Sequence, residues 1–177
     1  QRVTGIDLMQ EICQQSKVNH WKVFLFGAKP GVADEAGKKL EKQYGTLVAG
    51  MAHGYFKPED EDAIIERINA SGADVLFLAL GAPKQEFWIH QYRDRLKVPV
   101  VVGVGGSFDV IAGTVKRAPV FFQKIGMEWL WRLIKEPWRY KRMMALPKFV
   151  RLVKKEVKRR NKEAYEKSLQ QQNRKNK

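Results

Sequence analysis

Four short apolar runs, each ending in or near a glycine, mark the first two thirds of the chain. They are residues 23–26, 47–49, 75–80 and 98–104. Between them apolar residues recur at helical spacing, as Val32, Ala36 and Leu40 do. Strands that are apolar throughout and alternate with helices are typical of a parallel sheet covered on both faces. The pattern therefore predicts an α/β fold, a Rossmann-like parallel sheet flanked by helices, over residues 1–119.

The chain opens with a helical pattern rather than with a strand. Ile6, Met9 and Cys13 lie three and four positions apart, which is the spacing of one helix face. A helix ahead of the first strand explains this opening. The alternative is that a further sheet element precedes the helix.

The pattern changes after Pro119. Residues 121–135 form a dense apolar and aromatic helix candidate that ends ahead of Pro137, and Pro147 suits the first position of a further helix. We therefore expect an amphipathic helical appendage over residues 120–165. Residues 166–177 are polar and low in complexity, and this composition predicts a disordered tail.

Charge is divided in the same way. Residues 1–115 hold 13 Lys and Arg against 14 Asp and Glu, whereas residues 116–177 hold 20 against 5. A basic, aromatic appendage on a near-neutral core indicates a negatively charged partner. The candidates are an anionic membrane face, a nucleic acid or a phosphorylated substrate. No apolar run approaches the roughly 20 residues of a membrane span, so membrane contact is expected to be peripheral.

The spacing of aromatic residues separates two of these partners. In residues 121–160 they alternate with large aliphatic residues at helical spacing, which favours an apolar side that faces a membrane. No nucleic-acid-binding motif is present. We therefore expect binding to an anionic membrane surface and no nucleic-acid partner.

Metal and cofactor signals are missing from the sequence. His20, His53 and His90 are scattered, and no DxD-type motif follows a predicted strand. There is also no GxxxxGK[ST] loop, which argues against an ordinary P-loop nucleotidase. The sequence predicts no metal site and no cofactor.

Candidate ligand-binding residues follow the predicted strands, because parallel sheets bind ligands at their carboxyl ends. Gln85 offers a donor and an acceptor, which suits a base edge, a diphosphate or a sugar hydroxyl. Asp109 follows a glycine run and could accept hydrogen bonds from ribose hydroxyls or a uracil N–H, or could cap a helix. Glu86 is interpreted as a first-turn acid favoured by the helix dipole.

Three arginines in the appendage could share one helical face if the helix continues through Pro137. Arg132, Arg139 and Arg142 lie seven and three positions apart, and guanidinium groups bind diphosphates through forked donors. Spacing alone favours the alternative, a solvated basic face.

Several motifs in combination resemble one enzyme family. They are RVTGIDLM at residues 2–9, GAPKQE at 81–86, and the run from Gly103 through Gly113 that continues to KRAP at 116–119. Together they resemble the WecG/TagA/CpsF glycosyltransferase family. The Trp- and Arg-rich extension after Pro119 is similar to that family's C-terminal appendage. Within the family the chain most resembles the TagA branch, the N-acetylmannosaminyltransferases of wall teichoic acid synthesis.

This resemblance implies a metal-independent, inverting transferase. Such an enzyme moves N-acetylmannosamine from UDP-ManNAc to the 4-hydroxyl of polyprenyl-diphosphate-linked GlcNAc. It would act as a peripheral protein at the cytoplasmic face of the bacterial cell membrane, held there by residues 121–160. The resemblance assigns catalytic roles to Arg2 and Gln85, and donor or diphosphate contacts to Thr4, Tyr55, Gln85, Asp109, Arg132, Arg139 and Arg142.

The resemblance also places the general base, an aspartate, upstream of Gln1, in a segment ahead of the Arg2–Gly5 motif. Other functions stay open at this point. One is a related transferase that uses another UDP-sugar, such as UDP-ManNAcA. The others are a non-catalytic nucleotide-binding domain and a nucleic-acid-binding module. The sequence leaves homo-oligomerisation open.

Overall fold

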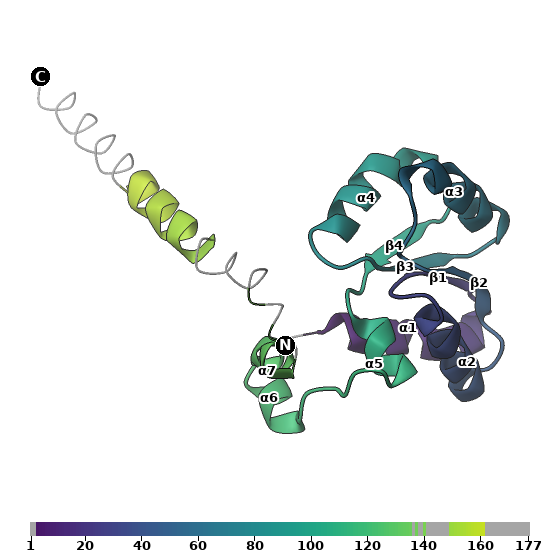
Figure 1. Ribbon diagram of the computed structural model, residues 1–177, viewed down its shortest axis with the longest axis horizontal. Helices are drawn as coiled ribbons and strands as arrows, with labels where there is room; N and C mark the ends of the chain where they lie inside the picture. The colour runs from purple at the N-terminus through teal and green to yellow at the C-terminus, as the bar shows by residue number, and fades with distance from the viewer. Residues whose placement is uncertain (1–2, 136, 138–139, 141–148, 162–177) are drawn as a thin grey trace, which may run out of the picture. The chain divides into compact units, whose positions relative to one another are not determined.

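The computed structural model describes residues 3–135, 137, 140 and 149–161. The chain divides into two compact units, residues 1–117 and 118–177. The first unit holds the sheet and the helices that pack on it (Figure 1).

A parallel sheet is the centre of the first unit. Its four strands are β1 (Val23–Gly27), β2 (Val48–Ala52), β3 (Val75–Ala79) and β4 (Val100–Gly103). Their order is β2-β1-β3-β4, and each neighbouring pair is parallel. The two central strands, β1 and β3, are buried along their whole length, which explains why their sequences are apolar at every position. The predicted strands and the predicted parallel α/β fold are confirmed.

Helices cover both faces of the sheet (Figure 1). One face carries α1 (Gly5–Asn19), α2 (Val32–Tyr44) and α5 (Ser107–Ala112), and the other carries α3 (Glu61–Ala70) and α4 (Lys84–Tyr92). The short 3-10 helices η1 (Pro58–Asp60) and η2 (Arg93–Arg95) adjoin α3 and α4.

Alternate side chains of each strand supply the two apolar layers. Leu25 and Phe77 pack with α1, α2 and α5, while Phe24 and Leu76 pack with α3 and α4. All four side chains have no exposed surface. Each stabilises the fold by about 1.5–3 kcal/mol through burial. The opening helix expected from Ile6, Met9 and Cys13 is α1, and those three side chains are buried.

The second unit differs from the sequence expectation in one respect. In place of one helix over residues 121–135, the chain forms α6 (Val120–Lys124) and α7 (Glu128–Lys135). Gly126 lies between them with a φ of 74°, a left-handed conformation that glycine adopts at little cost and that ends a helix. The Met127 N–H then bonds to the Phe122 carbonyl at 2.8 Å.

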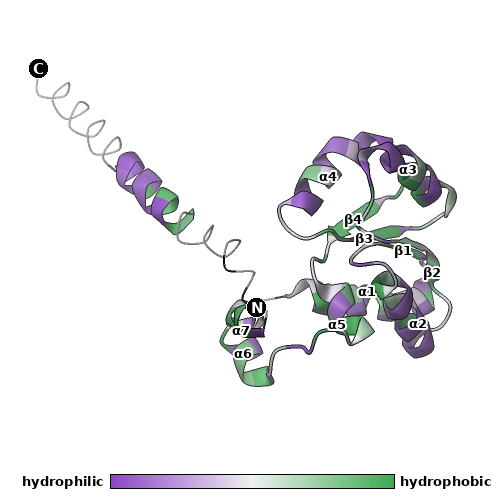
Figure 2. Ribbon diagram, viewed as in Figure 1, coloured by the Kyte–Doolittle hydropathy of each residue, from purple (hydrophilic) through white to green (hydrophobic). Residues whose placement is uncertain are grey.

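Apolar and basic residues mix along residues 149–161, which are helical. Figure 2 shows hydrophobic and hydrophilic residues side by side in this helix. Among the described residues, no helix has the length and apolar character needed to cross a bilayer.

Candidate functional site

The loops after the first three strands are tied together by backbone hydrogen bonds. The Ala28 N–H donates to the Ala79 carbonyl at 3.0 Å, and the Gly54 N–H donates to the Ala28 carbonyl at 2.8 Å. Gly27 permits this approach, because a Cβ on it would lie 2.5 Å from the Ala79 carbonyl carbon. The carboxyl ends of β1, β2 and β3 therefore form one edge, where ligands of parallel sheets bind.

Gln85 links the loop after β3 to the turn after β4. It lies in the first turn of α4 and is only 7% exposed. Its Oε1 accepts a hydrogen bond from the Gly105 N–H at 3.2 Å, and its Nε2 donates to Glu86 Oε1 at 2.9 Å. The amide predicted to bind ligand is thus bonded within the protein at both ends, while Glu86 beside it is exposed.

The N-terminal motif lies against the same turn. A Cβ on Gly5 would sit 3.4 Å from the Cα of Val104 and 3.8 Å from Ser107 Oγ. The first residues of α1 therefore border the turn that joins β4 to α5. This contact brings together two of the three motifs that carry the family resemblance, although about 100 residues separate them.

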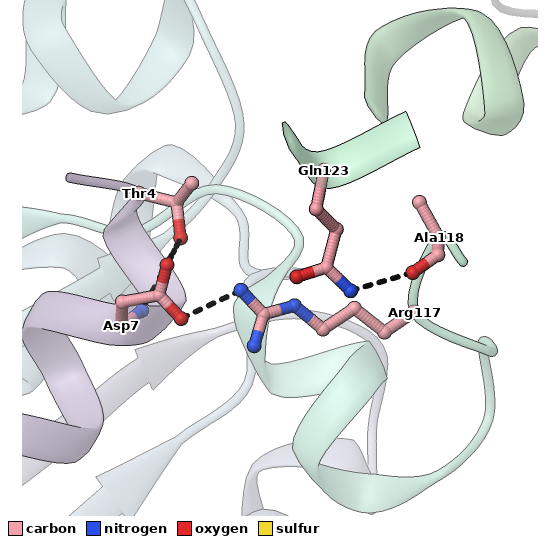
Figure 3. Close-up of polar contacts among 5 residues, drawn as sticks. All are labelled: Thr4, Asp7, Arg117, Ala118 and Gln123. Atoms are coloured by element: carbon pink, nitrogen blue, oxygen red, sulfur yellow. Dashed lines mark hydrogen bonds and ion pairs between the residues drawn. The ribbon is translucent and has the colours of Figure 1, made fainter. Parts of the chain in front are cut away.

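Thr4 and Asp7 form a cap at the start of α1 (Figure 3). The Thr4 hydroxyl donates to Asp7 Oδ2 at 2.5 Å and accepts from the Asp7 N–H at 3.3 Å. The other carboxylate oxygen, Oδ1, accepts from Arg117 Nη2 at 2.6 Å. These bonds, with that of Thr4 the largest cause, hold the pKa of Asp7 below its usual range. The hydroxyl of Thr4, a predicted donor contact, is thus engaged in a helix cap.

Asp109 occupies the first turn of α5 and is half-buried. The residue in the N-cap position is Gly106, so the alternative in which Asp109 caps the helix is wrong. Its backbone carbonyl accepts from Thr114 Oγ1 at 2.9 Å and from the Val115 N–H at 3.1 Å. Asp109 follows Gly105, the residue bonded to Gln85, by four positions, and the contact predicted between its carboxylate and a ligand stays a prediction.

Tyr55 lies three residues beyond β2, and its side chain is 65% exposed. Close by, a pocket of about 390 Å³ opens at the end of β2, lined in part by Asp34, His53, Asp60 and Arg67. Arg67 Nη2 donates to the Met51 carbonyl at 2.6 Å. In the part of the chain that the structure describes, no group of three or more His, Cys, Asp and Glu could hold a metal ion.

Four predicted site residues fall outside this description. Arg2, Arg139 and Arg142 lie outside the described residues. The side chain of Arg132 does so too, although its backbone belongs to α7. Gln1, upstream of which the general base is expected, is likewise outside the described residues. The contacts predicted for the four arginines and the upstream position of the base therefore stay predictions.

The profile of the glycosyl transferase WecG/TagA/CpsF family matches residues 1–163 of the 177. The match covers the sheet, the motifs at its carboxyl edge and most of the appendage. The chain belongs to this family. The WecG/TagA/CpsF family is a family of glycosyltransferases. The carboxyl edge of the sheet, where β1 to β4 end, is the candidate site of this member.

Sequence reasoning missed the pairing of Asp7 with Arg117. Both residues lie in motifs that carry the resemblance, RVTGIDLM and KRAP. The sequence predicted no structural role for either residue. The pairing could have been suspected because the two motifs hold residues of opposite charge, Asp7 and Arg117, to which no other function was assigned. Sequence reasoning also missed the contact of Lys84 Nζ with the ring of Phe56, whose centroid is 4.4 Å away.

Proposed function

We propose that this chain is an inverting, metal-independent glycosyltransferase that moves N-acetylmannosamine from UDP-ManNAc to the 4-hydroxyl of polyprenyl-diphosphate-linked GlcNAc. This product is the linkage unit of wall teichoic acid. The observation that carries the proposal is the family match over residues 1–163, which includes the motifs that meet at the carboxyl edge of the sheet. The TagA-type specificity comes from the sequence resemblance.

The donor would bind across the ends of β2, β3 and β4. We assign the nucleoside contacts to the ring of Tyr55, which follows β2, and to the carboxylate of Asp109, in the first turn of α5. A carboxylate accepts hydrogen bonds from ribose hydroxyls and from the uracil N–H. Gln85 supports the edge from within through its bond to Gly105.

The leaving diphosphate requires positive charge, because negative charge develops on it as the glycosidic bond breaks. Without a metal ion, arginines must supply it. We assign this role to Arg132, Arg139 and Arg142, together with a sugar or phosphate contact from Arg2. The general base would be an aspartate upstream of Gln1.

The acceptor carries a long lipid, so the enzyme must work at a bilayer. We propose that residues 121–160 hold it peripherally at the cytoplasmic face of the bacterial membrane. Exposed apolar side chains such as Phe149 and Leu152 stand beside basic residues in this segment. Each Lys or Arg near an anionic surface contributes about 1 kcal/mol to binding.

A transfer assay tests the proposal. The protein, extended upstream of Gln1 by its native sequence because the general base is expected there, is incubated with a soluble lipid-diphosphate GlcNAc acceptor and with UDP-ManNAc, UDP-ManNAcA or UDP-glucose, in parallel reactions with and without EDTA. We expect product only from UDP-ManNAc, with equal rates in EDTA. Product from UDP-ManNAcA instead would assign the related transferase activity, and loss of activity in EDTA would contradict metal independence.

A further inference from the structure

The carboxylate of Glu86 is exposed, but a buried neighbour holds one of its oxygens. Gln85 Nε2 donates to Glu86 Oε1 at 2.9 Å, while Gln85 Oε1 accepts from the Gly105 N–H. A buried amide destabilises the folded state when its oxygen or its nitrogen is left without a hydrogen-bond partner. Since Gln85 is only 7% exposed, its amide is fixed, and it fixes the direction of the Glu86 carboxylate.

Gly103 provides the space that this amide occupies. A Cβ on Gly103 would lie 2.5 Å from Gln85 Nε2 and 3.0 Å from its Cδ. Gly103 is not among the glycines with positive φ, so its backbone conformation does not require glycine. The absence of a side chain at Gly103 therefore leaves room for the Gln85 amide. The amide cannot move out of this position without losing both hydrogen bonds.

Charge decides which part of a ligand Glu86 can meet. A carboxylate repels a diphosphate but accepts hydrogen bonds from hydroxyl groups. Its Oε1 already accepts from Gln85, so its second oxygen is the one that a ligand hydroxyl would meet. Glu86 is an exposed residue in the first turn of α4, the helix that follows β3. Lys84, two residues earlier and also exposed, carries the charge that suits phosphate. The turn thus presents an anion and a cation side by side.

We propose that Glu86 contacts the ligand by accepting a hydrogen bond from a hydroxyl of the nucleotide sugar, and that Gln85 is its positioning residue. This inference rests on the proposed function, because the nucleotide sugar is the proposed donor. The shared chemistry is a sugar hydroxyl, which belongs either to the ribose or to the transferred N-acetylhexosamine.

Calorimetric titration of the full chain with UDP, 2′-deoxy-UDP and UDP-ManNAc tests the ligand contact. We expect Glu86→Ala to weaken binding by about tenfold, the effect of losing one hydrogen bond to a charged group. If the 2′-hydroxyl of the ribose makes the contact, Glu86→Ala weakens binding of UDP and leaves that of 2′-deoxy-UDP unchanged, whereas a contact with the 3′-hydroxyl weakens binding of all three ligands equally. If a hydroxyl of the hexosamine makes the contact, Glu86→Ala weakens binding of UDP-ManNAc and leaves that of UDP unchanged. Glu35→Gln, which removes an exposed first-turn acid of α2, is the matched control and should bind all three ligands as the wild type does.

Gly103→Ala tests the positioning role, because it displaces the Gln85 amide and leaves both Gln85 and Glu86 in the chain. We expect Gly103→Ala to weaken binding of the same ligand whose binding Glu86→Ala weakens. In a chain that already carries Glu86→Ala, it should have little further effect on affinity. A merely structural defect would weaken all ligands alike. Gln85→Met, which keeps the length of the side chain without its hydrogen bonds, serves the same test if Gly103→Ala does not fold.

The outcomes separate this inference from the proposed function. If the wild type binds no UDP or UDP-ManNAc, the proposed donor is wrong and the inference falls with it. If the wild type binds and Glu86→Ala behaves like Glu35→Gln, the inference alone is overturned. If Gly103→Ala and Gln85→Met both retain wild-type affinity for every ligand, Gln85 does not position Glu86.

Discussion

Asp7 and Arg117 form an ion pair across 110 positions of the chain, with 2.6 Å between Asp7 Oδ1 and Arg117 Nη2. Arg117 is the last residue of the first compact unit. The pair therefore ties the C-terminal end of this unit to the first turn of α1. Both side chains are partly exposed, at 44% for Asp7 and 31% for Arg117, so solvent screens their attraction.

The pH dependence of stability should report this pair. The pKa of Asp7 is lowered in the fold, so the carboxylate stabilises the folded state above its unfolded pKa of about 3.9. This contribution is lost as the pH falls through the lower, folded value. We expect Asp7→Asn to reduce stability at pH 7 by about 1 kcal/mol or less, and wild type and variant to converge at the lowest pH.

Thermal melts from pH 7 to pH 2.5 measure this convergence. Asp94→Asn, which changes an exposed acid in η2, is the control and should leave the melting temperature at pH 7 nearly unchanged. A constant difference between wild type and Asp7→Asn at every pH would show that the loss comes from packing rather than from the charge.

A second prediction concerns the approach of β1 to β3. Gly27 has a φ of 136°, and a Cβ there would lie 2.5 Å from backbone of Ala79. Gly45 has a φ of 89°, but nothing lies within 4 Å of its Cβ position. Gly45→Ala should cost about 1–2 kcal/mol for backbone strain alone. We expect Gly27→Ala to cost at least about 2 kcal/mol more, measured by urea unfolding, and equal losses would contradict the steric explanation.

The strands and the parallel sheet could be predicted because one principle determines them. A strand buried on both faces must be apolar at every position, and β1 and β3 are. The break between α6 and α7 could not be predicted in the same way. Apolar spacing continues through Gly126, and only the observed positive φ of that glycine shows that the helix stops there.

The candidate site was predictable at the level of its loops but not at the level of its contacts. Parallel strands end at one edge, so the position of Gln85 and Asp109 after strands indicated their location. Whether Gln85 faces a ligand or the protein depends on contacts with Gly103 and Gly105, which are about 20 residues away in sequence. Such long-range contacts leave no periodic signal, and the buried position of Gln85 emerged only from the structure.

Asp109 offers a test of the donor site that spares the fold. Its backbone carbonyl makes the bonds to Thr114 and Val115, so replacing the side chain leaves them intact. We expect Asp109→Ala to weaken UDP binding by about tenfold or more while the circular dichroism spectrum and melting temperature stay close to wild type. Unchanged affinity would remove Asp109 from the proposed donor site.

The position of the general base is open to direct measurement. If the base lies upstream of Gln1, residues 1–177 should bind UDP but transfer sugar slowly, because a general base contributes about 10²–10⁴-fold to rate. The comparison is with a chain extended upstream by its native sequence, assayed with the same donor and acceptor. Equal rates for the two chains would place the base within residues 1–177.

The last prediction concerns the exposed apolar and basic residues of the second unit. Phe149 and Leu152 are 63% and 65% exposed in the 149–161 helix, beside Lys154 and Lys155. Interfacial helices bind through apolar burial and through attraction to anionic lipid. These two contributions respond differently to salt, because ions screen the attraction between exposed charges and leave burial largely unaffected.

Sedimentation with phosphatidylglycerol-containing vesicles separates the two contributions. Leu152→Ser should weaken binding at both low and high salt, whereas replacing Lys154 and Lys155 together with Gln should weaken it mainly at low salt. Removing all residues after Pro119 should abolish association. Neutral phosphatidylcholine vesicles are the control and should bind the wild type weakly, since the charge contribution is then missing. Sedimentation of the truncated chain, or a preference of the full chain for RNA over anionic vesicles at equal salt, would contradict membrane docking by this segment.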